Sequence, residues 1–88
     1  MAHFAHVVDG VVVGVHVVVN SVITDSDGVE QEALGQEFLA GLHGENPSDF
    51  IQCSYNGSFR GVYPGPGYSY DSVNDIFLPP ALEPVSEA

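Results

Sequence analysis

The sequence predicts a small α+β domain: an N-terminal β-hairpin in a small, mainly antiparallel sheet, with one helix packed on that sheet. Three observations lead to this prediction. Valines recur on both sides of a two-residue turn signal, Asp9-Gly10. A stretch with helical apolar spacing follows, and the chain then breaks into short aromatic segments separated by Gly and Pro. Residues 1–78 form the predicted domain, and residues 79–88 form an extended Pro-rich C-terminal arm.

The first predicted unit is a β-hairpin that joins Ala2–Val8 to Val11–Asn20. Both of its faces are largely apolar, because valines occupy alternate positions on each side. One helix can cover only one face of such a sheet, and an uncovered valine face would promote aggregation. We therefore expect a partner surface to cover the second face.

A regular register of this hairpin places His3 opposite His16. Two imidazoles at such a pair could share a metal ion, but a protein site needs more ligands than these two, and surface or interface histidines explain them better. His6 alternates with core residues and His43 lies at a helix end, so neither is expected to be a ligand. The sequence therefore predicts no metal site and no cofactor.

The predicted helix begins after Asp27, which can serve as its N-cap with Glu30 at position N3 in a capping box. An acidic first turn also complements the positive end of the helix. Gly44 is expected to end it. The apolar stripe of the helix follows helical spacing and comprises Val29, Ala33, Leu34, Phe38 and Leu42.

The segment from Ser54 to Pro80 combines aromatic residues, Gly and Pro too densely for a generic linker. Asn56-Gly57 is predicted to be the turn of a second hairpin. The strands predicted in this half of the chain are Phe50–Tyr55, Ser58–Tyr63, Tyr68–Tyr70 and Ile76–Leu78. This composition favours packing and adhesion, and it contains no obvious reaction chemistry.

The composition argues against nucleic-acid binding and against catalysis. The chain of 88 residues has a formal net charge of −11 and a single basic residue, Arg60, whereas phosphate binding depends on Lys and Arg. The one cysteine, Cys53, is expected to be a small buried residue. Because no activated nucleophile or metal motif occurs, the protein is not expected to be an enzyme. No signal peptide or membrane-spanning segment is expected.

Four sequence marks form a pattern along the chain. They are HFA at His3–Ala5, F-L-x-x-L-x-G at Phe38–Gly44, Q-x-S-Y-N-G-x-F-R at Gln52–Arg60 and G-x-G-Y-x-Y-D…D-x-F-x-P-P at Gly65–Pro80. In these marks the chain resembles a family of small proteins encoded among the virion genes of marine and cyanobacterial tailed bacteriophages. The resemblance covers nearly the whole chain and is most specific in its centre.

Two positions depart from that family. Its members usually carry a tryptophan where this chain has Asp49-Phe50, and a lysine where it has Gly61. Any binding role of that tryptophan or lysine therefore does not carry over. The resemblance implies a structural component of a phage particle and does not itself indicate which part.

The first functional hypothesis is a capsid decoration, or cement, protein on the outer surface of the phage head. It would be made in the host cytoplasm, bind the major capsid protein and stabilise the shell by bridging capsomers, with homo-oligomers possible at a capsomer axis. The alternative is a tail or tail-fibre-associated structural protein; an intracellular acidic DNA mimic is supported by net charge alone. Neither nucleic acid nor membrane is an expected partner.

The residues expected to contact a partner combine the aromatic segments, the single arginine and two apolar positions of the arm. Arg and Tyr are enriched among interface residues that contribute strongly to binding. For Arg60 the expected role is internal, by pairing with a carboxylate or stacking on an aromatic ring, and contact with a partner is the rival role. The full set is Tyr55, Phe59, Arg60, Tyr63, Tyr68, Tyr70, Leu82 and Val85.

Overall fold

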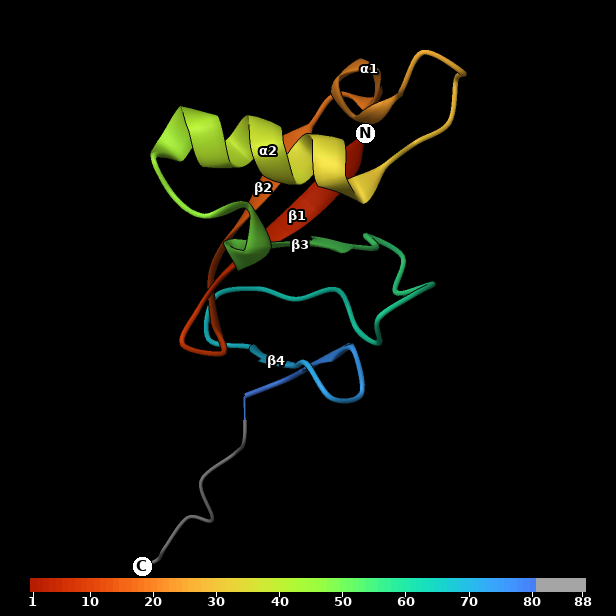
Figure 1. The fold of residues 1–88 in the computed structure, drawn as a ribbon. Coiled ribbons are helices and arrows are strands. Elements are labelled where there is room, and N and C mark those ends of the chain that lie inside the picture. Colours follow the sequence, from red (N-terminus) through yellow and green to blue (C-terminus); the bar gives the residue numbers. More distant parts are fainter. Residues whose placement is uncertain (81–88) are drawn as a thin grey trace, which may run out of the picture.

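The computed structural model describes residues 1–80, which form one five-stranded antiparallel sheet with helices over one side (Figure 1). The strands are β1 (Ala2–Val8), β2 (Val11–Val18), β3 (Phe50–Cys53), β4 (Ser69–Asp71) and β5 (Ile76–Leu78), in the order β3-β1-β2-β4-β5. The helices are α1 (Asn20–Ile23), α2 (Glu32–His43) and the short 3-10 helix η1 (Pro47–Asp49). The predicted α+β class is confirmed; beyond its first two prolines, the expected arm lies outside the described residues.

The turn between β1 and β2 forms as the sequence predicts. Asp9 and Gly10 both have positive φ angles, 52° and 80°, which a two-residue turn matching the twist of the strands requires. Val8 lies opposite Val11, the pair expected next to such a turn. The local sequence is therefore sufficient to specify the turn.

The register further along the hairpin differs from the prediction because β2 contains a bulge. His6 pairs with Gly14 and Val7 with Val12, so Val13 has no partner on β1. Beyond the bulge every pair is displaced by one residue. The predicted His3–His16 pair is therefore wrong: His3 lies opposite Val17 and His16 lies opposite Phe4.

Each face of the sheet has a buried core formed by this chain, although Val11, Val13 and Val17 of β2 remain 43%, 52% and 54% exposed. A partner surface over the second face therefore stays a prediction. The face under the helices has the core Ala2, Phe4, Val18, Ile23, Leu39, Ala40 and Phe50. The opposite face has the core Ala5, Val12, Cys53 and Phe77, with Tyr63, Tyr68 and Tyr70 packed against it. The aromatic C-terminal half thus supplies the second layer.

The loop before α2 is organised by Asp25 and not by the predicted capping box. The carboxylate of Asp25 accepts hydrogen bonds from the backbone N–H groups of Asp27 and Val29, both at 2.9 Å. The helix begins at Glu32, and its N-cap Gln31 makes no side-chain capping bond. Asp27 and Glu30 therefore do not cap α2, because this Asx-type loop takes up the residues that the capping box needed.

Helix α2 faces the sheet with a different side from the predicted one. Gly35 and Leu39 are buried, whereas Phe38 and Leu42 are 46% and 66% exposed. The close approach at Gly35 explains the rotation, since a Cβ there would lie 2.2 Å from Cζ of Phe4. The end of the helix is as predicted: Gly44 is left-handed, with φ 70°, and donates to the carbonyl of Ala40 at 2.8 Å.

None of the helices within residues 1–80 has the length and apolar character to cross a membrane.

The predicted strand Ser58–Tyr63 is absent, and this stretch is a loop that runs beside β5. Arg60 and Gly61 both have positive φ angles, 55° and 77°, which interrupt any extended segment. The N–H of Gly57 bonds to the carbonyl of Ser54, so Asn56-Gly57 completes a turn that begins at Ser54 and does not centre a hairpin. A single parallel bridge joins Gly61 to Phe77.

We expect Gly35→Ala to destabilise the protein and Gly41→Ala, in the same helix, to stabilise it. The first methyl group collides with Phe4 and Ile23, and overpacking of this kind costs about 1–3 kcal/mol. The second meets nothing within 4 Å and gains about 0.5–1 kcal/mol of helix propensity. Urea unfolding followed by circular dichroism measures both, and equal stability of the two variants would contradict this packing.

Candidate functional site

The structure divides the predicted partner-binding residues into three groups. Tyr63, Tyr68 and Tyr70 are half-buried and pack on the sheet, so their main role is in the core of the second layer. Leu82 and Val85 lie outside the described residues. The remaining members are Tyr55 and Phe59, which are exposed, and Arg60.

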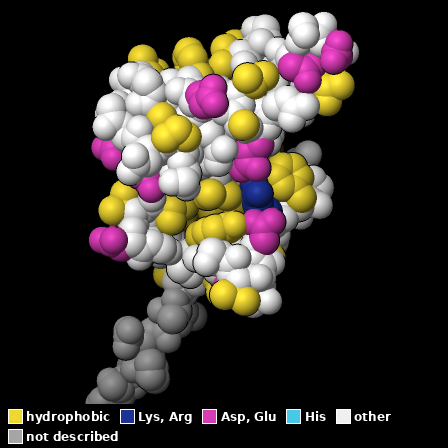
Figure 2. All heavy atoms as spheres, viewed as in Figure 1, with side chains coloured by type: hydrophobic (Ala, Val, Ile, Leu, Met, Phe, Trp, Pro, Cys, Tyr) yellow, Lys and Arg dark blue, Asp and Glu magenta, His cyan; other side chains and the backbone are white. Residues whose placement is uncertain are grey.

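Arg60 joins three parts of the fold through its guanidinium group. Its Nη1 donates to Glu32 Oε2 at 2.7 Å, and its Nη2 donates to Glu32 Oε1 at 3.1 Å. Its Nε donates to Asp75 Oδ1 at 2.9 Å. Figure 2 shows this single basic side chain enclosed between acidic ones. The internal pairing expected from the sequence is therefore the observed one, and the arginine is not a free interface anchor.

Burial, hydrogen bonds and ion pairs around Arg60 shift the pKa values of three side chains in this network. Burial alone would lower the pKa of the Arg60 guanidinium, but its hydrogen bonds and ion pairs with Glu32 and Asp75 raise it overall. The hydrogen bond from the Tyr70 hydroxyl, followed by the contact with Arg60, lowers the pKa of the Asp75 carboxyl. Burial, aided by that same hydrogen bond, raises the pKa of Tyr70 to about 12.

The outer edge of β3 is closed by side chains. Gln36 donates to the carbonyl of Phe50 at 2.7 Å, and Glu32 accepts from the N–H of Gln52 at 2.8 Å. Arg60 also donates to the carbonyl of Gln52 at 2.9 Å. Because these backbone groups already have partners, β3 offers little to a strand from another molecule.

The other edge strand, β5, is closed by the chain itself. The N–H of Phe77 donates to the carbonyl of Arg60 at 2.9 Å, and the loop bridge at Gly61 lies beside the same strand. At both edges of the sheet, backbone groups that a further strand would need are therefore already hydrogen-bonded. Partners are expected to bind side chains, and not to add a strand.

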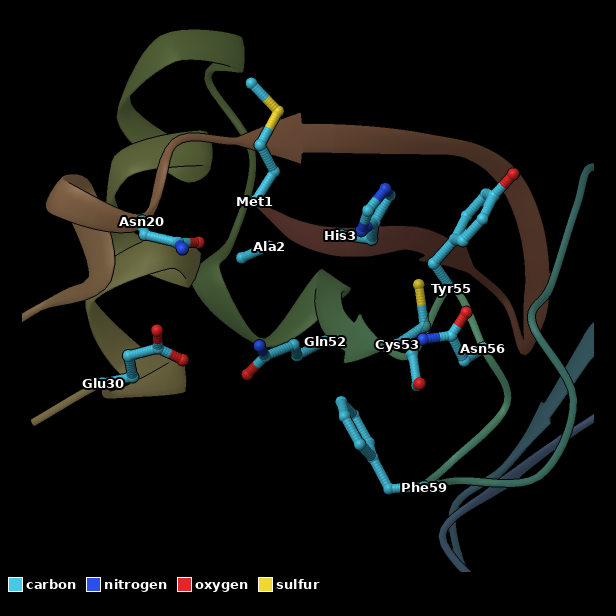
Figure 3. A pocket seen from close by; sticks show the side chains of 11 residues that line it. Met1, Ala2, His3, Asn20, Glu30, Gln52, Cys53, Tyr55, Asn56 and Phe59 are labelled. Carbon is cyan, nitrogen blue, oxygen red and sulfur yellow. The ribbon is translucent and has the colours of Figure 1, made fainter.

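A hollow of about 250 Å³ lies where the N-terminus meets the loop that follows β3 (Figure 3). The aromatic hollow, as we call it, is bounded by Met1, His3, Tyr55 and Phe59 among others, and Gln52 and Cys53 lie between them in the close-up. Tyr55 is 67% exposed, yet its ring stacks on His3 with 5.5 Å between centroids. The hollow therefore combines aromatic rings with polar side chains such as Glu30 and Asn56, so it offers both stacking and hydrogen-bonding contacts.

Cys53 contributes little reactivity to this hollow. The residue is buried, and burial raises the pKa of its thiol to about 11. At neutral pH the thiol is therefore protonated, and the thiolate is the reactive form of cysteine. The expectation of a small buried residue is confirmed.

Three histidines gather on the helix side of the sheet, around Phe50. The ring of His6 stacks on Phe50 at 4.7 Å, and the rings of His16 and His43 lie 4.6 Å apart. Burial, followed by the charges of His43 and His6, lowers the pKa of His16. This cluster could not be predicted from the sequence, because it depends on the bulge at Val13, which moves His16 to the face of His6.

We expect Arg60→Lys to lower the free energy of unfolding by about 1–3 kcal/mol, although it keeps the charge. An ammonium group cannot span Glu32, Asp75 and the Gln52 carbonyl as the guanidinium fork does. Both side chains meet the same positive φ, so backbone strain cancels in the comparison. Chemical denaturation measures the loss, with exposed Glu37→Gln as the control; a lysine variant as stable as the parent would show that this network gives no net stability.

We expect the protein to lose stability at alkaline pH as Tyr70 ionises. The pKa in the folded state is raised to about 12, above the ordinary value of about 10, so the contribution is complete below pH 10 and is lost as pH rises through 12. Phenolate absorbance and denaturation curves taken between those pH values measure it. Tyr70→Phe removes this component, and an unchanged alkaline profile in that variant would contradict the assignment.

Comparison with known proteins identifies no relative of this chain. No family model, curated protein or solved structure matches this chain. The function must therefore be inferred from the residues and their arrangement.

Proposed function

We propose that this protein is a head decoration (cement) protein of a tailed bacteriophage, which binds the outside of the capsid shell and bridges neighbouring capsomers. The observation that carries the proposal is the aromatic hollow, where exposed aromatic side chains gather on a strongly acidic molecule. The sequence resemblance to a phage virion family supplies the biological setting. The proposed role is one of binding, without catalysis.

The charge distribution supports a position away from packaged DNA. The chain has one Lys or Arg against twelve Asp and Glu. That one cation is engaged by Glu32 and Asp75, so it is not available for phosphate groups. An acidic protein on the outer surface of a head meets solvent and shell protein, and it needs no basic face.

The exposed aromatic side chains support a protein partner. Tyr55 and Phe59 lie in the loop that follows β3, at the rim of the hollow in Figure 3, and they are 67% and 45% exposed. Aromatic residues of this kind are enriched in interfaces and depleted among ordinary exposed positions. The closed edges of β3 and β5 leave side-chain docking as the mode of contact. The major capsid protein is the proposed partner.

The proposed mechanism is thermodynamic linkage. A subunit that binds the assembled shell, and not the free shell protein, stabilises the assembly by its binding free energy. When one subunit contacts two capsomers, or when copies cluster at a symmetry axis, the contacts multiply. A tail or tail-fibre role remains the alternative, since the same aromatic surface could stack on sugars.

The first test is quantitative mass spectrometry of purified particles of the encoding phage, with heads and tails separated. We expect this protein in the head fraction, at a simple ratio to the major capsid protein, because decoration sites repeat with the lattice. A small number of copies confined to tails would favour the alternative. Absence from both fractions would reject either structural role.

A second test uses the aromatic hollow directly. We expect Tyr55→Ser with Phe59→Ser to abolish binding of the purified protein to undecorated heads, as measured by co-sedimentation. Val73→Ser, at an 89% exposed position in the turn between β4 and β5, is the matched control and should bind normally. Normal binding by the double variant, with circular dichroism unchanged, would show that another surface makes the contact.

A further inference from the structure

We propose that His6, Glu45 and Asp49 bind a divalent transition-metal cation of the Zn²⁺ class. The site lies at the corner where β1, the end of α2 and η1 meet. It is separate from the aromatic hollow, and the proposal does not depend on the function proposed above. It also revises the expectation from sequence that no metal binds and that His6 is not a ligand.

The three ligand atoms already converge. A ring nitrogen of His6 and one carboxylate oxygen from each of Glu45 and Asp49 all lie within 4.8 Å of one another. Ligands around tetrahedral Zn²⁺ lie at about 2.0–2.2 Å from the metal, which places them about 3.4 Å apart. Glu45 is exposed and Asp49 half-buried, so rotation of these side chains can close the difference.

The buried nitrogen of His6 points to a missing partner. Among the described residues, Nε2 of His6 is the one buried side-chain nitrogen or oxygen that has no hydrogen-bond partner. Buried polar groups without a partner carry a substantial free-energy cost and are rare in folded proteins. A metal ion coordinated by Nε2 itself would remove that cost, so the proposal assigns Nε2 as the ligand atom of His6.

The two carboxylates also lack a compensating positive charge. No hydrogen bond or salt bridge within residues 1–80 involves the carboxylate of Glu45 or Asp49, and the only guanidinium group is engaged at Glu32 and Asp75. Two such groups close together repel each other when both are ionised. A dication between them would convert this repulsion into attraction.

The backbone holds all three residues in place. The N–H groups of Gly44 and Glu45 both bond to the carbonyl of Ala40, which fixes the chain as it leaves α2. Asp49, the last residue of η1, donates its N–H to the carbonyl of the N-cap residue Asn46. It directly precedes Phe50, the residue that pairs with His6 between β1 and β3. Only side chains therefore need to move when the cation binds.

The donor set indicates which cations fit. One imidazole with two carboxylates suits Zn²⁺ and its first-row neighbours, whereas Ca²⁺ and Mg²⁺ prefer oxygen ligands alone. The neighbouring imidazoles of His16 and His43 belong to the same cluster, and water can occupy a remaining position. The bound ion would connect β1 to the segment after α2 in a small chain that has one cysteine and therefore no internal disulfide.

The test is titration of the chelator-treated full-length protein with Zn²⁺ by calorimetry, and with Co²⁺ by visible absorption. We expect one ion per chain, d–d bands typical of four- or five-coordinate Co²⁺, and a higher melting temperature with Zn²⁺. His6→Asn and Glu45→Gln are each expected to weaken binding by more than about tenfold. His3→Asn and Glu37→Gln, which leave the corner intact, are the matched controls and should bind as the parent does.

Two results would overturn the proposal. One is absence of stoichiometric binding by the parent protein. The other is unchanged affinity in Glu45→Gln, a substitution at an exposed position that is not expected to affect folding. If His6→Asn fails to fold, Glu45→Gln and Asp49→Asn decide the question. Failure of this proposal would not affect the proposed function, because the aromatic hollow and the metal site have no residue in common.

Discussion

The fold depends most on the convergence of three chain segments at Arg60. Its guanidinium group contacts the first turn of α2 through Glu32, the edge of β3 through the Gln52 carbonyl, and the turn between β4 and β5 through Asp75. The helices cover one side of the sheet, whereas β3 and the β4–β5 hairpin contribute its two edges, so this side chain links the helix layer to both edges of the sheet. In a chain that is otherwise acidic, no other basic side chain can replace it.

Signals confined to a few neighbouring residues were sufficient for the class of fold and for its simplest turns. Asp9-Gly10 and Gly44 each favour a backbone conformation with positive φ, which depends little on the rest of the chain. The orientation of α2 could not be predicted, because it depends on how closely Gly35 approaches Phe4 from a distant strand. Apolar spacing identified a helix correctly, but the buried side was chosen by the smallest side chain and not by the most hydrophobic ones.

The two candidate sites likewise differ in how far the sequence could predict them. Composition selected Tyr55 and Phe59 together with Tyr63, Tyr68 and Tyr70, but the last three pack on the sheet, so composition alone did not separate exposed aromatic residues from buried ones. The corner at His6 could not be predicted, because its members approach only through the sheet pairing with Phe50 and the path of the chain around η1. These three residues come from separate segments of the chain, and only the fold brings them together.

The bulge at Val13 shows how one additional residue can redistribute chemistry between the two sides of a sheet. With a regular ladder, His16 would lie on the face of the tyrosines, among hydroxyl groups and the thiol of Cys53. The single unpaired residue sends it to the opposite face, where it meets two other imidazoles. The face on which each later residue of β2 lies therefore depends on whether the number of residues before it is odd or even. An insertion or deletion of one residue between Val12 and Gly14 would move every following side chain of β2 to the opposite face, although the composition of the strand would hardly change.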